Sequence, residues 1–357
     1  MKNMKSFLNE KFFRLLVVIA AVCFVIQYCS QKSVILVIHS YNTDYSWVKD
    51  LNKGIDRVLE KQKSYIVVKY HYMDTKNHPK QEDIIKAGKI TQEIISILKP
   101  SVIIAIDDDA QKYVGKHYVN HPDIKLVFAG VNSEIEDYGY KTANNVTGYL
   151  ERIPIDAVVD FLTYAKSKIT PHKKLRVVHV HDTSKTVILD NQRLKEFKQW
   201  GQVELLPSIE VKNFSEWKNA IKKTEQIADV ILLSNYRKIF NDGTDKLVSP
   251  EKVMNWAFEN SQNLILGLNG FVTEDGGALS IGASPFEQGE EVMEMALQLF
   301  NHKKTLKDLP IKETRQYIVS VHQERYAKSY IKKGIDLPKS YEALARAVGK
   351  YMIEKGR

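Results

Sequence analysis

The stretch ALSIGASPFEQGEEVMEMALQLF, residues 278–300, decides the fold of this 357-residue chain. It predicts a short strand at 278–283 and a helix at 286–300, in which apolar side chains recur with helical period. Two complete sets of alternating strands and helices precede it, and neither set needs a further strand and helix. The stretch therefore predicts that the chain returns from the second set to the first.

The first set lies upstream, between residues 34 and 129. Its short runs rich in Val and Ile alternate with longer segments of helical period, which is typical of a parallel sheet covered by helices on both faces. The predicted strands are 34–39, 65–70, 102–106 and 125–129, and the predicted helices are 48–61, 81–98 and 110–118. This set is one complete doubly wound lobe.

The second set repeats the pattern without any sequence repeat of fixed period. The predicted strands are 175–180, 203–209, 230–234 and 264–268, and the predicted helices are 155–166, 186–200, 213–226 and 250–260. A last strand at 316–321 and a helix at 323–332 follow the deciding stretch. We expect the chain to cross between lobes near Gly148, Gly282 and Tyr317, which makes a hinge.

These crossings divide the chain into three predicted regions. Residues 1–29 form a signal peptide or an N-terminal membrane anchor. Residues 34–148 with 282–316 form an N-terminal lobe, and residues 149–281 with 317–357 form a C-terminal lobe. The fold class is therefore α/β, with two doubly wound Rossmann-like lobes joined by a three-strand hinge.

The first 29 residues have the order of an export signal, since basic residues precede an unbroken apolar run at 15–26 and Cys29 follows it. The run is short for a spanning helix, which needs about 20 residues. Three fates stay open: lipidation at Cys29, an uncleaved anchor, or cleavage that frees the protein. We expect a protein on the periplasmic or extracellular face, tethered to the cytoplasmic membrane by lipid or by an uncleaved helix.

Composition excludes several classes of function. Both cysteines, Cys23 and Cys29, belong to the leader, so the folded part has no disulfide, thiol nucleophile or thiolate metal site. The formal net charge is +9, but basic residues are scattered among acidic ones, which is typical of a solvated surface. No nucleic-acid partner is expected.

The candidate binding residues follow from the rule that ligands of open parallel sheets bind beyond the carboxyl ends of the strands. The loop after the first strand offers hydroxyls, an amide and aromatic rings, which suit hydrogen bonding and stacking. The loops after the third and fourth strands add a carboxylate and an amide. The N-terminal lobe thus supplies these predicted ligand-binding residues: Ser40, Tyr41, Asn42, Tyr45, Trp47, Asp108 and Asn132.

The corresponding loops of the second set are polar as well, as a cleft between two lobes requires. They follow the strands at 175–180, 230–234 and 264–268. The residues predicted to contact the ligand from the C-terminal lobe are Asp182, Thr183, Asn235, Tyr236 and Asn269.

Three adjacent carboxylates, Asp107, Asp108 and Asp109, follow the third strand. Such a run can bind a metal ion or an ammonium group, and one member can cap the next helix. Consecutive side chains cannot all face one ion, and no calcium-binding loop surrounds them. We therefore predict no metal site, and expect Asp108 to contact the ligand.

Motifs of the common enzyme classes are absent from the sequence. No G-x-S-x-G elbow, no G-x-G-x-x-G after the first strand and no P-loop occurs. His179 and His181 lack a third metal ligand at short range. The one carboxylate arrangement that suits catalysis is the run at 107–109 with Glu274 or Asp275. We expect no enzyme activity and no cofactor.

Several segments, taken in order, resemble the ABC-transporter substrate-binding proteins related to the tryptophan-binding component, which have the type I periplasmic-binding-protein fold. The matching segments are VIHSY at 37–41, FAGVN at 128–132, NVTG at 145–148, GAL at 277–279, SPFEQG at 284–289 and GIDLP at 334–338. The chain differs from the tryptophan-binding members at IDDD, residues 106–109, where those have a hydroxyl-rich loop.

This resemblance implies a binding function without chemistry. We expect the protein to capture a small ligand, polar or amino-acid-like, between its lobes and to deliver it to an ABC permease and ATPase. The alternative is a membrane-tethered, ligand-sensing partner of a separate sensor kinase.

Overall fold

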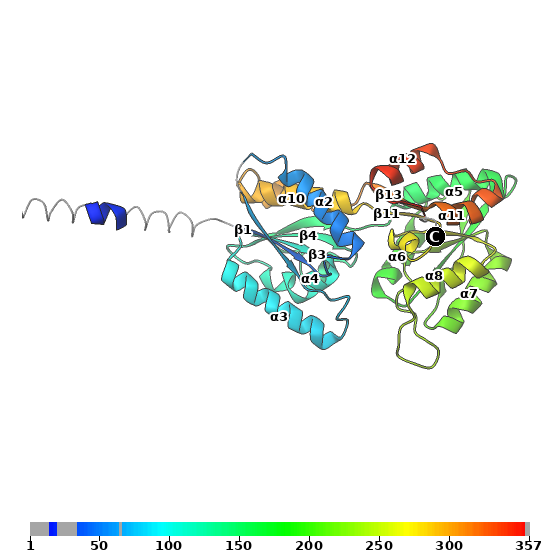
Figure 1. The fold of residues 1–357 in the computed structure, drawn as a ribbon, viewed down its shortest axis with the longest axis horizontal. Coiled ribbons are helices and arrows are strands. Elements are labelled where there is room, and N and C mark those ends of the chain that lie inside the picture. The colour runs from blue at the N-terminus through cyan, green and yellow to red at the C-terminus, as the bar shows by residue number, and fades with distance from the viewer. Residues whose placement is uncertain (1–13, 20–33, 64–65, 354–357) are drawn as a thin grey trace, which may run out of the picture.

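The computed structural model describes residues 14–19, 34–63 and 66–353. The proposed lipidation residue Cys29 and most of the predicted leader lie outside the described residues. Two α/β lobes stand side by side, and the segments that join them run between the two sheets (Figure 1). Within the described ranges, no helix is both long enough and apolar enough to cross a membrane.

The N-terminal lobe contains a six-stranded parallel sheet. Its strand order is β12 (Lys312–Glu313), β5 (Val146–Leu150), β4 (Lys125–Val131), β3 (Val102–Ile106), β1 (Val34–His39) and β2 (Val67–Tyr72). Helices α2 (Ser46–Leu59) and α10 (Pro285–Phe300) cover one face, and α3 (Gln81–Leu98) and α4 (Asp107–Tyr113) cover the other (Figure 1). Burial on both faces explains the continuous apolar runs of β1 and β3.

The C-terminal lobe contains an eight-stranded sheet. Its strand order is β14 (Tyr351–Met352), β13 (Tyr317–His322), β11 (Leu279–Ala283), β10 (Leu264–Gly267), β9 (Val230–Leu233), β6 (Leu175–His181) and β7 (Val203–Leu205), with β8 (Ile209–Glu210) also paired to β6. Only the β11–β13 pair is antiparallel among these described strands.

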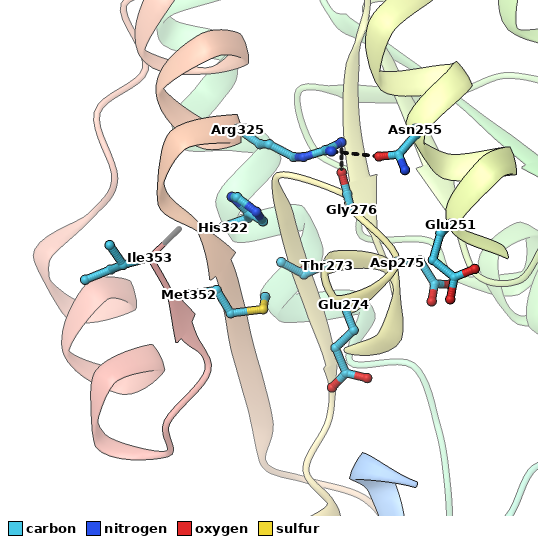
Figure 2. A pocket seen from close by; sticks show the side chains of 10 residues that line it. All are labelled: Glu251, Asn255, Thr273, Glu274, Asp275, Gly276, His322, Arg325, Met352 and Ile353. Carbon is cyan, nitrogen blue, oxygen red and sulfur yellow. Dashed lines mark hydrogen bonds between the residues drawn. The ribbon is translucent and has the colours of Figure 1, made fainter. Parts of the chain in front are cut away.

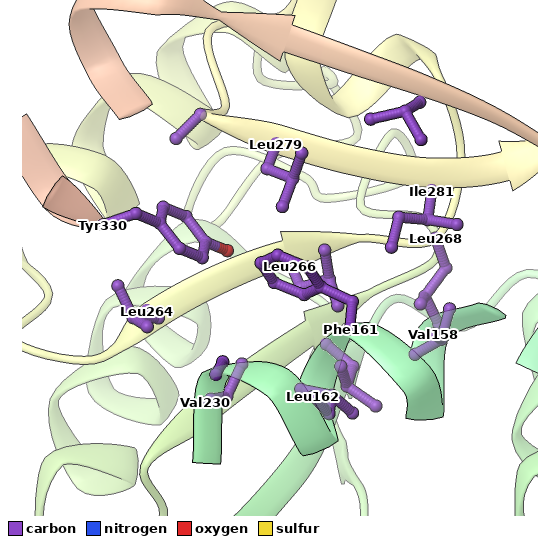
Figure 3. Close-up of a cluster of buried hydrophobic side chains, with 14 of the residues drawn as sticks. Val158, Phe161, Leu162, Val230, Leu264, Leu266, Leu268, Leu279, Ile281 and Tyr330 are labelled. Carbon is purple, nitrogen blue, oxygen red and sulfur yellow. The ribbon is translucent and has the colours of Figure 1, made fainter. Parts of the chain in front are cut away.

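Helices also cover both faces of this second sheet. One face carries α5 (Ile155–Ile169), α11 (Gln323–Ser329) and α12 (Lys339–Ala347), and the other carries α7 (Phe214–Ile227) and α8 (Pro250–Asn260). Figure 3 shows Phe161 of α5 packed on Leu266 and Leu279 of the sheet, with Tyr330 beside them.

The chain passes between the two sheets three times. Residues 151–154 lead from β5 to α5, Ser284 leads from β11 to α10, and residues 314–316 lead from β12 to β13. The helix after β11 therefore packs on the first sheet, as the deciding stretch predicts. The predicted fold class, two doubly wound lobes joined by a three-strand hinge, is confirmed.

One buried carboxylate connects all three passages. Glu287, near the start of α10, is 4% exposed. It accepts hydrogen bonds from the Tyr149 hydroxyl at 2.7 Å, from the Gln316 amide at 2.8 Å and from the Arg315 amide at 3.1 Å. Tyr149 lies in β5, the strand that leads into the first passage, and Arg315 and Gln316 lie in the third passage. The hinge segments are thus held together by one acceptor group.

Helices α2 and α10 approach closely through a pair of glycines. A Cβ atom on Gly289 would lie 2.1 Å from the Leu51 carbonyl oxygen, and one on Gly54 would lie 2.2 Å from the Phe286 carbonyl oxygen. Backbone atoms cannot move aside as side-chain ends can, so this contact requires glycine on both helices. It fixes the distance of α10 from the first lobe.

Several predicted elements differ from the structure in their bounds, and two of these differences have a clear physical consequence. The strand predicted at 203–209 is interrupted between β7 and β8, because Pro207 has no amide hydrogen for the ladder with β6. The helix predicted at 110–118 begins instead at Asp107, so the three aspartates lie in the first turn of α4 rather than in a loop.

Replacing Gly289 by Ala tests the contact between α2 and α10. Alanine favours an isolated helix over glycine by about 1 kcal/mol, but here the added methyl group would collide with backbone. We expect G289A to lower the free energy of unfolding by about 1–3 kcal/mol in urea denaturation. The control is Glu294→Ala on the exposed side of α10. A stabilised G289A protein would contradict the inferred contact.

Replacing Glu287 by Gln tests the hinge carboxylate. The side-chain NH2 group of glutamine would face N–H or O–H groups that now donate to a Glu287 oxygen. Those buried donors would lose their acceptor, which costs about 1–3 kcal/mol. We expect E287Q to lower the free energy of unfolding by about 1–3 kcal/mol, seen as a lower midpoint of urea unfolding. The control is Glu290→Gln, which removes the partly exposed ion pair between Glu290 of the same helix and Arg57. It should lower the midpoint of urea unfolding far less. Equal effects would count against the hinge role.

Candidate functional site

The carboxyl ends of both sheets face the space between the lobes, and side chains from the two lobes touch there. The Ser46 hydroxyl donates to Glu274 at 2.7 Å. Lys350 pairs with Asp50 at 2.7 Å. A third contact joins Arg193 of α6 (Lys185–Glu196) to Glu134 and to the Asn132 carbonyl. The loops predicted to bind a ligand therefore meet across one region.

Several predicted site residues hold their own loops in shape. The Ser40 hydroxyl donates to the Ile106 carbonyl at 2.7 Å and accepts from the Ala110 amide at 2.8 Å, which ties the end of β1 to the start of α4. Asn42 accepts from the Tyr45 amide at 3.0 Å and closes the turn before α2. These side chains position the loop, and their hydrogen-bonding groups are engaged within the protein.

The three adjacent aspartates serve three different purposes. Asp108 accepts from the Tyr138 hydroxyl at 2.6 Å and from the amides of Asn132 and Ser133, so it anchors the loop after β4. Asp109 accepts from the Thr75 hydroxyl at 2.7 Å and anchors the loop after β2. Asp107 is the remaining member, and it faces the space between the lobes.

Asp107 combines burial, strain and an unused acceptor. Its side chain is 4% exposed, and its Oδ2 atom has no hydrogen-bond partner among the described residues. Its φ angle is +66°, a conformation that costs energy for a non-glycine residue. Gly130 leaves room for the carboxylate, since a Cβ there would lie 2.8 Å from Oδ1. Burial raises the pKa of Asp107 well above its ordinary value, and the Glu151 charge raises it further.

Two more buried carboxyl groups extend this region, Glu151 beside Asp107 and Asp190 beside Glu151. Glu151, at the first passage between lobes, accepts from the Asn132 amide group at 3.0 Å, and burial raises its pKa to about 8. Asp190 of α6 is 5% exposed, and burial raises its pKa to about 7 against the opposing charge of Arg193. The negative charges of these groups oppose one another's ionisation. A cation beside these carboxyl groups would favour their ionised forms.

The tyrosines predicted at the first loop form an aromatic surface. The rings of Tyr41 and Tyr45 lie edge to face with centroids 5.3 Å apart. The ammonium nitrogen of Lys76 lies 3.3 Å from the Tyr45 centroid and 4.1 Å from the Tyr41 centroid. Desolvation between the lobes lowers the pKa of Lys76, and the charge of Arg237 lowers it further, although the side chain stays accessible to water. We call Tyr41 and Tyr45 the tyrosine pair.

Sequence reasoning missed Lys76 because the second strand ends later than predicted. The prediction ended it at residue 70, whereas β2 runs to Tyr72. The loop that follows, with Thr75 and Lys76, was therefore not read for site residues. The rule of examining residues just after each strand would have found Lys76 from the correct strand end.

The C-terminal lobe contributes a paired arginine. Arg237 donates to Asp275 through Nη2 at 2.7 Å and Nε at 3.2 Å, and its guanidinium lies 4.2 Å from the Phe271 ring centroid. The Tyr236 hydroxyl donates to the same carboxylate at 2.8 Å. Tyr236 is fully buried, so it contacts the site through Asp275 rather than through its ring.

The other predicted residues of this lobe shape its loops. Asp182 accepts from the Ser184 and Lys238 amides, each at 2.8 Å. Asn235 accepts from the Arg237 amide at 3.0 Å, and Asn269 donates to the Ser234 carbonyl at 2.7 Å. Thr183 is half-buried in the loop of Asp182, and Trp47 in the other lobe packs against the N-terminal core.

We define the interlobe site by the side chains that the structure brings together from both lobes. The sequence predicted the tyrosine pair as ligand-binding residues, and it named Asp107 and Asp275 only in the carboxylate arrangement considered for catalysis. The members are Tyr41, Tyr45, Lys76, Asp107 and Glu151 of the N-terminal lobe and hinge, with Asp190, Arg237 and Asp275 of the C-terminal lobe. No group of three or more His, Cys, Asp or Glu side chains in the described ranges is arranged to hold a metal ion.

A separate cavity of about 300 Å³ lies on the C-terminal lobe (Figure 2). Arg325 spans it, donating to the Gly276 carbonyl and to Asn255, and His322 points in from β13. Glu274 and Asp275 line its edge toward the other lobe. The cavity therefore adjoins the interlobe site through the short helix α9 (Phe271–Glu274).

Comparisons with known proteins identify the fold. No protein-family model matches the sequence, and no curated protein matches it. The ligand-free, open structure of a substrate-binding protein with adhesive properties from Clostridium difficile is similar, with a TM-score of 0.62 at 16% identity, over 91% of this chain and 100% of that one.

Two other solved structures are similar to the same extent. An ABC domain in complex with L-Trp from Streptococcus pneumonia has a TM-score of 0.58 at 15% identity, over 87% of this chain and 98% of that one. A conserved domain protein from Vibrio cholerae has a TM-score of 0.58 at 14% identity, over 90% and 99%. The chain therefore has the type I periplasmic-binding-protein fold that the sequence resemblance implies.

Replacing Glu151 by Gln tests whether the buried carboxyl group of Glu151 lowers the stability of the protein at a pH where it would ionise in water. The folded protein keeps this carboxyl neutral up to a pH of about 8, whereas in the unfolded chain it ionises near its ordinary pKa of 4.5. Its cost to stability therefore grows from pH 5 to pH 8. We expect E151Q to raise Tm by about 2 °C at pH 8 and by less at pH 5, measured by calorimetry.

The control for this experiment is Glu134→Gln, an exposed carboxylate at the edge of the same region. Its effect on Tm should not grow with pH. A gain for E151Q that is equal at both pH values, or a loss at pH 8, would show that Glu151 is not destabilised by burial.

Proposed function

We propose that this protein is an extracytoplasmic solute-binding protein that captures one small ligand between its lobes. The single observation that carries the proposal is the interlobe site, where charged and aromatic side chains from both lobes converge beside a three-strand hinge. A ligand in that position contacts both lobes at once. It can therefore stabilise the approach of the lobes through its higher affinity for the closed arrangement.

The partners follow from the same proposal. An ABC permease and ATPase would receive the solute, and the leader would tether the protein to the membrane by lipid on Cys29 or by an uncleaved helix. The fold shared with the substrate-binding protein of Clostridium difficile and with the ABC domain that binds L-Trp supports delivery to an importer.

Native mass spectrometry of the protein purified from its own cells tests the proposal. We expect one small molecule per chain. Added back to stripped protein at 100 times its Kd, that molecule should stabilise the fold by about 2.7 kcal/mol, which raises Tm, and should lower the radius of gyration in small-angle X-ray scattering. No bound solute, and no compaction with a broad solute panel, would overturn the proposal.

Cross-linking in native membranes then tests the partner. Capture of a permease with its ATPase is the expected result. Capture of a sensor kinase in place of a permease would replace delivery by ligand sensing, while the binding function would stand.

A further inference from the structure

The interlobe site has a chemical bias that narrows the class of ligand. Its carboxyl groups form two neighbouring pairs, in which Glu151 hinders the ionisation of Asp107 and Asp190 hinders that of Glu151. The guanidinium of Arg237 is already neutralised by the two hydrogen bonds to Asp275. A cationic group placed beside Asp107 and Glu151 would favour the ionised form of these carboxyl groups and pair with it.

The unpaired oxygen of Asp107 is a second, separate indication of a ligand. Its Oδ2 atom is buried without a hydrogen-bond partner among the described residues, and an unpaired buried acceptor is costly. Asp107 lies close enough to Tyr41, Tyr45 and Lys76 for its charge to act on all three. The backbone of Asp107 also has a strained φ of +66°. Such strain is typical of functional positions, and no hydrogen bond within the described part of the lobe uses the Oδ2 atom that this conformation places.

Lys76 shows which kind of group this surface accepts. Its ammonium lies against both rings of the tyrosine pair, in the geometry of a cation–π interaction. Lys76 is held there by its neighbour, because the Thr75 hydroxyl bonds to Asp109 and to the Ser40 carbonyl. No ion pair within 4.0 Å joins Lys76 to a carboxylate among the described residues, so its charge is supported by the rings rather than by a direct partner.

We propose that the ligand carries a protonated primary amine that takes the place of the Lys76 ammonium on the tyrosine pair and donates a hydrogen bond to Asp107. This inference rests on the proposed function and specifies its ligand class. Lys76 is then an internal competitor, because it occupies the aromatic surface and leaves it when the amine enters. Solutes whose amine is too weakly basic to be protonated do not displace it.

The test compares amines with hydroxyl analogues of the same skeleton. The probes are 1,4-diaminobutane, tyramine and L-leucine, paired with 1,4-butanediol, tyrosol and 2-hydroxy-4-methylpentanoate. Thermal shift and calorimetry on the full-length protein report binding. We expect at least one amine to bind at least tenfold more tightly than its hydroxyl partner.

Two variants assign the roles of the residues. Asp107→Asn should weaken amine binding at least tenfold, and asparagine tolerates the positive φ at this position. Lys76→Met should tighten it by about fivefold, the effect of removing a competing cation–π contact. The controls are Asp83→Asn and Lys80→Met, both exposed outside the site.

The outcomes separate this inference from the proposed function. Equal binding of hydroxyl analogues, unchanged binding by D107N or weaker amine binding by K76M overturns the inference and leaves solute binding intact. If no probe binds, the solute carried by the protein from its own cells decides. A solute without a basic nitrogen, or one that D107N still binds, overturns this inference alone. An amine that D107N no longer binds supports the inference. If the protein carries no solute at all, both proposals are overturned.

Discussion

The structure depends on how one buried charge is satisfied. Glu287 is placed in the interior at the start of α10, where an ionised carboxylate is tolerated only if donors surround it. Its donors are the Tyr149 hydroxyl, from the strand that leads into the first passage, and the amides of Arg315 and Gln316 in the third passage. The three hinge segments must therefore lie together wherever α10 begins, and the position of each lobe's sheet follows from that requirement.

The neighbouring residue extends this constraint into the first lobe. Gln288 donates to Thr314 at 2.7 Å and accepts from the Gly130 amide at 3.0 Å. Gly130 in turn leaves the space in which the Asp107 carboxylate lies. The hinge and the interlobe site are thus one connected arrangement. Within it the same chemical group is treated in two ways: the Glu287 carboxylate has its donors, whereas Asp107 keeps an oxygen without one. A carboxylate left in that condition is expected at a functional position rather than a structural one.

The sequence predicted the fold far better than the site, and the reason is physical. Burial on both faces makes the strands continuous apolar runs. The surplus helix at 286–300 packs on the first lobe as expected, although the strand before it, β11, stays in the second sheet. Polar residues after the strands were predicted to bind ligand, but Ser40, Asp108 and Asp182 use their acceptors to close the loops, since backbone amides at strand ends need partners. Asp190 lies within α6, where no rule about strand ends would find it.

The contrast between hinge and lobe contacts explains how such a molecule can respond to a small ligand. The hinge interactions are buried and hydrogen-bonded, so the three segments stay together in any arrangement of the lobes. Across the interlobe region the contacts are few, and two of them, Ser46 to Glu274 and Arg193 to Glu134, involve exposed carboxylates. Exposed pairs of this kind contribute about 0–1 kcal/mol each. A ligand that gains a few kcal/mol by touching both lobes therefore outweighs these exposed contacts. The largely buried Lys350–Asp50 pair also favours the arrangement seen here, so ligand and protein together set the balance between open and closed arrangements.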